Sequence, residues 1–417
     1  MLSVPIRIPL FAIILVWLLA IPTARPAFAL ADDSTEDSEP RWTFDWDNSF
    51  KITRNDGEIA LTLGGRIQND WVFYDADSAL EARVGELEDG SEFRRARLFV
   101  SGKLWKVVEL KVQYDFAGGD ATFKDVYLGL IDLPGVGGLR IGHLKEPFSL
   151  DEQTSSKYIL FMERAPVLEA FSLARNNGFM IGQNATGKDP RITWRLGAFK
   201  EVDDFGDGLS EEWNLTGRIT GTPVWKANSK VLHLGLAVSL RSPADDTVRF
   251  RSRPGSHLAP RFVDTGPFAA DGVTQLGLEL AWIDGPLSTQ AEWVRADVDA
   301  LGAPDPTFGG YYAAVGWILK RGYSRPYKRS EGSLDRLEVR DQDRFRRGGW
   351  GIWELAARYS SLDLDDGAVR GGQLDDWTLG LNWYLLSNVR TTFNYVRADL
   401  DGVGTADALQ LRFQVEF

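Results

Sequence analysis

The last eleven residues of the chain, DALQLRFQVEF, alternate between apolar and polar side chains. In an extended strand, Leu409, Leu411, Phe413, Val415 and Phe417 would share one face, and the polar residues between them would share the other. Many other segments show the same two-residue period, and in several of them the polar face carries full charges. In a soluble sheet the apolar face would point inward, whereas in a membrane-spanning barrel it points outward to lipid. Periodicity alone leaves both arrangements open.

The alternating segments predict sixteen strands, an even number, as a closed single-chain barrel requires. They are residues 58–74, 92–104, 106–117, 122–133, 138–145, 177–186, 190–200, 211–223, 229–241, 272–284, 286–297, 307–320, 348–361, 373–387, 388–400 and 405–417. Most have about 10 to 14 residues, which suits a tilted membrane-spanning strand and exceeds the usual length in soluble sheets. We therefore predict an all-β fold, a transmembrane antiparallel β-barrel over residues 58–417.

The connections between these strands alternate in length, as they do in bacterial outer-membrane barrels. With both ends of the barrel sequence in the periplasm, the outer loops include the long segments 75–91, 146–176 and 242–271, and the periplasmic turns include the short segments 134–137 and 187–189. One periplasmic turn, residues 321–347, breaks this rule because it has 27 residues, with nine Lys or Arg against five Asp or Glu. Either a strand is miscounted, or this turn has a role of its own.

The first 31 residues are typical of a cleaved signal peptide. Arg7 precedes an apolar stretch at residues 8–21, and small residues suitable for cleavage occur up to Ala29 and Ala31. The alternative, an N-terminal membrane anchor, is disfavoured because the apolar stretch is shorter than the roughly 20 residues of a spanning helix. Residues 32–57 would then form an acidic N-terminal leader and periplasmic segment ahead of the barrel.

Composition excludes several classes of protein. The chain has no Cys, which excludes disulfides, Cys-ligated metals and a Cys nucleophile, and its three His lack metal-ligand spacing. The net charge of −12 argues against a nucleic-acid partner. No nucleophile motif, P-loop or zinc-protease motif occurs. We therefore expect no catalytic residues, no metal site, no cofactor and no enzymatic activity.

The segment at residues 139–178 resembles the phosphate-selective porin O/P family. It contains a G-x-x-K-x-P-F motif (Gly142, Lys145, Pro147 and Phe148), an M-E-R box (Met162, Glu163 and Arg164), and an Arg shortly before a Gly (Arg175 and Gly178). Further matches, FRRARLFVSGKL, KDVYLG, NLTGRITGTP and GIWELAARYSSLDL, follow in family order across nearly all of the expected mature chain.

This resemblance implies an outer-membrane porin of a Gram-negative bacterium, usually a homotrimer, which lets small anions diffuse passively and favours phosphate-type substrates. It also implies that the long loops and the one long periplasmic turn constrict the lumen. Its partners would be small anions, outer-membrane lipid and, because the C-terminal strand ends on Phe417, the barrel-assembly machinery. A weakly selective general diffusion porin is the main alternative. An outer-membrane barrel enzyme ranks below both, because the sequence offers no nucleophile–base pair.

Strand parity and the family motifs together nominate cationic residues for an anion pathway. Parity places many Arg and Lys on the lumenal face, together with Glu and Asp, so many of these charges should pair across the wall. The basic turn adds three cations within four residues. The candidates are Arg95, Arg97, Lys103, Lys145, Arg164, Arg175, Arg195, Arg218, Arg344, Arg346 and Arg347.

Overall fold

The computed structural model describes residues 41–417, apart from residues 172, 174, 184–190, 204, 209–211 and 227–228. The expected signal peptide and the first part of the acidic leader lie outside the described residues. The described chain contains three short α-helices, α2 (Ser78–Val84), α3 (Leu150–Gln153) and α4 (Pro166–Ala170). In this part of the chain, no helix has the length and apolar character needed to cross a bilayer.

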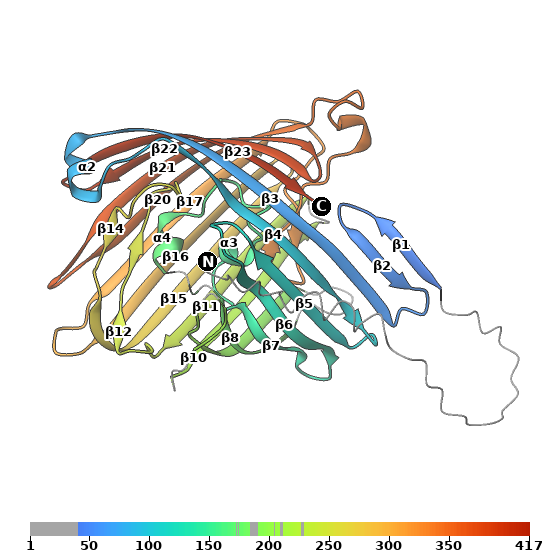
Figure 1. The fold of residues 1–417 in the computed structure, drawn as a ribbon, viewed down its shortest axis with the longest axis horizontal. Coiled ribbons are helices and arrows are strands. Elements are labelled where there is room, and N and C mark those ends of the chain that lie inside the picture. The colour runs from blue at the N-terminus through green and yellow to red at the C-terminus, as the bar shows by residue number, and fades with distance from the viewer. Residues whose placement is uncertain are drawn as a thin grey trace, which may run out of the picture. The chain divides into compact units, whose positions relative to one another are not determined.

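Sixteen long strands of the described chain form one closed antiparallel barrel (Figure 1). They are β3 (Ile59–Ala76), β4 (Gly90–Leu104), β5 (Val108–Asp115), β6 (Thr122–Leu133), β7 (Gly137–Lys145), β8 (Arg175–Gln183), β9 (Ile192–Lys200), β10 (Asn214–Lys226), β11 (Lys230–Arg241), β15 (Phe268–Asp284), β16 (Leu287–Ala300), β17 (Thr307–Ile318), β20 (Ile352–Asp366), β21 (Val369–Leu386), β22 (Val389–Leu400) and β23 (Gly404–Glu416). Each strand pairs with the next, and β23 pairs with β3 to close the barrel. The sixteen-stranded barrel predicted from the sequence is confirmed.

Alternation along each strand separates an apolar outer surface from a polar lumen. In β23, Leu409 and Phe413 are 60% and 50% exposed, whereas Gln410 and Arg412 are 4% and 0% exposed. The buried face is therefore the polar one, which is the reverse of a soluble sheet and is what a lipid-facing barrel requires.

Aromatic side chains on the outer surface form contacts across neighbouring strands. Tyr359 lies between Tyr311 and Trp377, with ring centroids 6.1 and 4.9 Å away, respectively. Trp353 stacks on Trp383 at 4.9 Å. Rings of this kind are favoured where a membrane protein passes through the lipid–water interface.

A short hairpin precedes the barrel. It consists of β1 (Trp42–Trp46) and β2 (Phe50–Arg54), and β2 pairs with the first residues of β3, from Phe50↔Leu63 to Thr53↔Ala60. The hairpin is visible beside the start of β3 in Figure 1. Part of the segment expected to be a leader is therefore an extension of the sheet.

The loops at one end of the barrel, here called the loop end, fold inward. Loop 146–174 connects β7 to β8 and carries α3 and α4, which lie within the barrel outline in Figure 1. Loop 242–267 carries β12 (Thr247–Val248), β13 (Arg251–Ser252) and β14 (Val263–Asp264), and Ser252 donates to the Pro166 carbonyl of α4 at 2.9 Å. Apolar residues of both loops, including Phe171 and Phe250 with ring centroids 5.4 Å apart, form a core inside the wall.

The opposite end, here called the turn end, has tight connections and one long insertion. Residues 134–136, 285–286 and 387–388 link their strands directly, as the sequence predicts. The long insertion, turn 319–351, joins β17 to β20 and carries β18 (Tyr327–Lys328), β19 (Ser333–Leu334) and the 3-10 helix η1 (Asp341–Asp343). Two connections at the loop end, residues 367–368 and 401–403, are also short, so length alone does not identify the side of a connection.

Candidate functional site

The lumen contains a cavity of about 530 Å³ along one half of the barrel wall. Its wall residues come from the consecutive strands β3 to β9, and the rest come from loop 146–174 and turn 319–351. Both inserted segments therefore reach the cavity, as the sequence predicts for the lumen. They also touch each other, because the Leu334 main-chain N–H donates to Thr154 Oγ1 at 3.1 Å.

Charge dominates the lining of this cavity. Eleven Arg and Lys side chains and five Asp and Glu side chains line it. The cations are Arg66, Arg95, Arg97, Lys111, Arg140, Lys145, Lys157, Arg164, Arg175, Arg195 and Lys328, and the anions are Glu109, Asp125, Glu152, Glu331 and Asp335. The cavity therefore has a surplus of positive charge although the whole chain has a net charge of −12.

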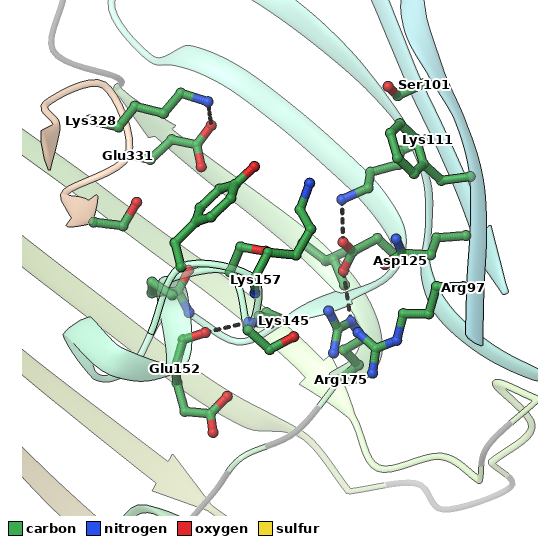
Figure 2. Close-up of a pocket in the computed structure, with 18 of the residues that line it drawn as sticks. Arg97, Ser101, Lys111, Asp125, Lys145, Glu152, Lys157, Arg175, Lys328 and Glu331 are labelled. Carbon is green, nitrogen blue, oxygen red and sulfur yellow. Dashed lines mark hydrogen bonds and ion pairs between the residues drawn. The ribbon is translucent and has the colours of Figure 1, made fainter. Parts of the chain in front are cut away.

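Most of the lining carboxylates are neutralised by a nearby cation. Lys111 and Arg175 both bind Asp125, and Arg175 Nε lies 2.7 Å from the carboxylate (Figure 2). Glu109 pairs with Arg140 at 2.6 Å. Each of these pairs fixes side chains of the wall and removes the carboxylate as a repulsive charge for a passing anion.

Two further pairs involve the inserted segments. Arg164 pairs with Glu152 at 3.1 Å and also donates to the Asp151 carbonyl at 3.0 Å, which holds loop 146–174 together internally. In turn 319–351, Lys328 pairs with Glu331 at 2.6 Å. Burial opposes ionisation of Glu331, but Lys328 and Arg195 more than compensate and lower its pKa to about 2. Glu331 is therefore an anion at neutral pH.

Three cations of the cavity make no ion pair with any carboxylate in the described part of the chain. Arg66 contacts Ser155 Oγ at 3.2 Å, Arg195 contacts Gln153 Oε1 at 3.4 Å, and Lys145 donates to the Glu152 carbonyl (Figure 2). Arg66 Nε and Arg195 Nη2 are buried without a hydrogen-bond partner among the described residues. Cations inside a membrane protein that lack a carboxylate partner are costly, so they commonly mark an ion pathway.

Arg218 has a different role, although strand parity correctly places it inside the barrel. Its guanidinium binds Glu279 at 2.7 and 2.8 Å and donates to the Gly332 carbonyl at 2.8 Å. His233 contacts the same carboxylate at 3.0 Å and the Tyr327 hydroxyl at 2.6 Å. Arg218 therefore docks turn 319–351 against the wall and does not line the cavity.

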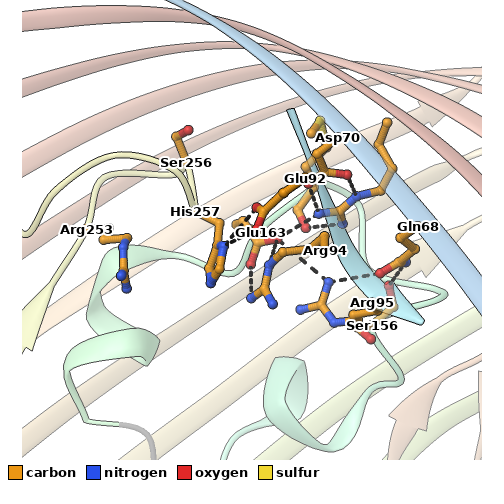
Figure 3. Close-up of polar contacts among 12 residues, drawn as sticks. Gln68, Asp70, Glu92, Arg94, Arg95, Ser156, Glu163, Arg253, Ser256 and His257 are labelled. Atoms are coloured by element: carbon orange, nitrogen blue, oxygen red, sulfur yellow. Dashed lines mark hydrogen bonds and ion pairs between the residues drawn. The ribbon is translucent and has the colours of Figure 1, made fainter. Parts of the chain in front are cut away.

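Glu163 of the M-E-R box is also structural. Arg94 Nε approaches its carboxylate at 2.9 Å, Arg412 at 2.7 Å and Arg95 at 3.7 Å. Figure 3 shows Arg94 and Arg95 converging on Glu163 from one strand. Arg412 pairs in addition with Asp70 at 2.6 Å. The box thus ties the inserted loop to both sides of the seam between β23 and β3.

The glycines of the motifs have a packing role. A Cβ on Gly142, whose φ is +134°, would lie 2.4 Å from the Val126 carbonyl oxygen, and a Cβ on Gly178 would lie 2.3 Å from the Ala198 carbonyl oxygen. Phe148 is buried over Gly277, where a Cβ would lie 2.8 Å from its ring. These motif residues allow close strand and loop packing beside the cavity.

Six of the eleven nominated residues line the cavity, namely Arg95, Arg97, Lys145, Arg164, Arg175 and Arg195. Lys103 and Arg218 do not. Arg344, Arg346 and Arg347 do not line it either. Phe345 packs on Trp350 and on Trp383 of the outer aromatic surface, with ring centroids 6.4 and 5.6 Å away, so this part of the turn is held at the rim. The part of the turn that lines the cavity lies within residues 328–335.

Five lining cations were missed by the sequence analysis: Arg66, Lys111, Arg140, Lys157 and Lys328. Arg66 alternates in phase with the lumenal Gln68 and Asp70, so parity could have identified it. Lys157 and Lys328 lie in the loop and the turn, where no periodicity exists, and the sequence carries no signal that would place them.

Comparisons with known proteins agree with this architecture. A family model described as phosphate-selective porin O and P matches residues 61–417. Porin O of Pseudomonas aeruginosa is 26% identical over 396 residues, which cover 85% of this chain and 86% of that protein.

Two solved structures share the barrel. The anion-selective porin from Comamonas acidovorans matches with a TM-score of 0.53 at 12% identity, covering 86% of this chain and 100% of that one. OmpT of Vibrio cholerae, in its trimer form, matches with a TM-score of 0.52 at 12% identity, covering 85% of this chain and 99% of that one. At such low identity these two matches establish the fold alone.

Proposed function

Because the chain belongs to the phosphate-selective porin O and P family and is an anion porin of the Gram-negative outer membrane, we propose that it conducts phosphate-type anions in preference to chloride. The preferred anion would bind at Arg66, Lys145 and Arg195. The observation that carries this proposal is the lack of a carboxylate partner for these three cations, within the described chain, in a cavity whose other charges are mostly paired.

The chemistry of the three side chains suits a tetrahedral oxyanion. A guanidinium can meet two phosphate oxygens at once, and an ammonium adds a compact positive charge with three donors. Arg66 lies on β3, Lys145 on β7 and Arg195 on β9, so a phosphate among them would be approached from different strands. Arg66 Nε and Arg195 Nη2 have no hydrogen-bond partner among the described residues, so neither donor is committed to the wall.

The test is the reversal potential and the chloride conductance in planar bilayers, with and without added phosphate. Phosphate should reduce the chloride current of the unchanged protein. The variant Arg66→Gln/Lys145→Gln/Arg195→Gln should lose this block and shift the reversal potential toward cations. The effect should be larger at about 0.1 M salt, where the Debye length is about 10 Å, than at 1 M, where it is about 3 Å.

A matched control carries the same change of charge outside the cavity. Lys230, Arg295 and Arg397 are exposed ion-pair partners on the barrel, so Lys230→Gln/Arg295→Gln/Arg397→Gln should keep phosphate block and reversal potential unchanged. If phosphate fails to reduce the chloride current of the unchanged protein, the weakly selective general porin is the better description. If both triple variants behave alike, the assignment of the three cavity cations is wrong.

We also propose that the protein assembles as a homotrimer and acts without catalysis or cofactor. The similar barrel of OmpT occurs in a trimer form, which supports a trimer of this chain. Chemical crosslinking in native membranes should then give a species of three chains and none larger. A crosslinked ladder that ends at one chain would contradict trimer formation.

A further inference from the structure

A stretch of loop 146–174 lies inside the barrel without forming helix or strand. Residues 156–163 belong to no helix or strand, so their carbonyls cannot be satisfied within regular secondary structure. Seven of these eight carbonyls accept a hydrogen bond from a side chain elsewhere in the protein. The donors are Gln68 to Ser156 (3.2 Å), Gln414 to Lys157 (3.1 Å), Arg325 to Tyr158 (2.9 Å), Arg390 to Ile159 (2.8 Å), Asn382 to Leu160 (2.8 Å), Arg412 to Met162 (2.5 Å) and Arg358 to Glu163 (2.8 Å). We call these seven donors the carbonyl clamp.

The clamp draws its donors from one side of the barrel. Six lie on β20 to β23 and on β3, and the seventh, Arg325, belongs to turn 319–351. None of the seven lines the cavity, which lies along β3 to β9. The loop is therefore held against one half of the wall, and open space remains along the other half.

The same stretch presents side chains to the cavity. Lys157 and Tyr158 line it, and the Tyr158 ring lies 5.0 Å from Lys157 Nζ and 5.7 Å from the Arg336 guanidinium. Lys157 is further fixed by Glu416 at 2.8 Å. Because the carbonyls point to the wall and these side chains point to the cavity, any movement of the main chain would move the boundary of the pore.

The cationic donors of the clamp are already engaged by the protein. Arg412 binds Asp70 and Glu163, and Arg325 binds Glu354. Arg390 makes no ion pair within the described chain, but the residue is 3% exposed and its guanidinium is directed to the Ile159 carbonyl and Gln414. A cation in the lumen is thus not necessarily a cation in the anion pathway.

We propose that the carbonyl clamp is a positioning device that fixes the width and the off-centre course of the pore. Gln68, Asn382, Gln414 and Arg390 act through the main chain of residues 156–163, and not by contact with the permeating anion. The clamp also keeps the loop from swinging during conduction. This inference rests on the protein being a channel and is independent of its preference for phosphate.

Neutral donors allow a test without any change of charge. Asn382→Leu/Gln414→Met removes two carbonyl donors while nearly keeping side-chain volume. Each lost hydrogen bond should raise the population of a displaced loop about fivefold, so the pair should raise it about 25-fold. Single-channel recordings in 1 M KCl without phosphate should show a correspondingly larger fraction of time at a second conductance level.

The controls separate position from charge and from folding. Asn69→Leu/Gln373→Met changes two amides that bond outside the clamp and should leave the recordings unchanged. Arg390→Lys should conduct nearly as the unchanged protein, whereas Arg390→Met should populate the second level. Heat-modifiable migration on gels verifies folding. If the double variant does not fold, the single variant Gln414→Met can be tested instead, with an expected fivefold rise in the population of the displaced loop.

An unchanged fraction of time at the second level in a folded Gln414→Met or Asn382→Leu/Gln414→Met variant would overturn the proposal. The proposal would also be overturned if the reversal potential changed with the charge at position 390 while the neutral variants had no effect. Arg390 would then belong to the anion pathway. Because no phosphate is used, failure of the phosphate proposal does not affect either outcome.

Discussion

The main-chain N–H of Gly65 donates to the carbonyl oxygen of Phe417 at 2.5 Å, and the N–H of Phe417 donates to the Gly65 carbonyl at 3.2 Å. This pair ends the seam between β3 and β23, where the barrel closes. A Cβ on Gly65 would lie 2.7 Å from Cζ of the Phe417 ring. The terminal ring therefore occupies space that only glycine leaves free at position 65.

Replacing Gly65 with alanine should destabilise the barrel by about 1–3 kcal/mol, because the added methyl group overpacks the seam. The expected result is a lower guanidinium concentration at the midpoint of unfolding. Gly221→Ala is the matched control on β10, because the nearest atom to a Cβ there is 3.9 Å away. Equal midpoints for the two variants would show that the seam tolerates a larger residue.

Deleting Phe417 should impair insertion more than export. The deletion removes both hydrogen bonds to Gly65, which lie at the end of the seam between β3 and β23. We expect the shortened chain in the periplasm with little heat-modifiable barrel in the outer membrane. A normal amount of heat-modifiable barrel after the deletion would contradict this expectation.

Cysteines at positions 164 and 175 should react from the lumen. Both arginines line the cavity, and the chain has no native Cys, so labelling has no background. Small thiol reagents should label Arg164→Cys and Arg175→Cys, negatively charged reagents faster than positively charged ones, and bulky external reagents should not label them. The reverse order, with bulky external reagents reacting freely, would place the loop outside the pore.

Strand alternation, together with the number and length of the strands, predicted the barrel because each lipid-facing residue must be apolar while its neighbours face the lumen. Leu409 and Arg412, 60% and 0% exposed, are typical of the two faces. Connection lengths singled out the loop at residues 146–176 and the turn at residues 321–347 as unusually long, and the family resemblance added the expectation that such segments enter the lumen. Strand alternation and connection length depend on local sequence, so they can be predicted without knowing which residues contact each other in the folded chain.

The role of each lumenal cation could not be predicted in the same way. Arg66 and Arg412 both occupy lumenal positions of their strands. Arg412 is held by two carboxylates and the Met162 carbonyl, whereas Arg66 has no ion pair in the described chain. The difference arises from the path of loop 146–174 across the lumen, which brings Glu163 and its carbonyls to one side of the wall. Alternation along a strand predicts whether a side chain faces the lumen or the lipid. The hydrogen-bond or ion-pair partner of a lumenal side chain depends on how the loop folds.

The rim of turn 319–351 should loosen in acid. The Asp343 carboxylate accepts hydrogen bonds from Lys320 and from the Tyr323 hydroxyl, the latter at 2.6 Å, and these donors lower its pKa. Because the pKa in the folded turn is below the unfolded value, the stabilisation is complete above about pH 4 and is lost as pH falls through the folded pKa. Hydrogen exchange in residues 341–351 should therefore rise below that pH.

Asp343→Asn is the control for this acid sensitivity, because it removes the titrating group. Its exchange rates, corrected for the intrinsic effect of pH, should be raised at neutral pH and should change little in acid. If the unchanged protein and the variant respond equally to acid, another group governs the rim.

The basic cluster at the rim should contribute little to selectivity, although its charge density singles it out in the sequence. Arg344 pairs with the exposed Asp341 at 2.8 Å, and the Arg346 guanidinium lies 5.9 Å from the Phe345 ring, which is anchored on Trp383. Exposed charges of this kind are screened over about 8 Å at physiological salt.

Arg344→Gln/Arg346→Gln/Arg347→Gln should therefore leave the reversal potential at about 0.1 M salt close to that of the unchanged protein. The cavity variant Arg66→Gln/Lys145→Gln/Arg195→Gln removes the same charge and should shift it clearly toward cations. A larger shift from the rim variant than from the cavity variant would mean that anions are selected at the mouth, before they reach the cavity.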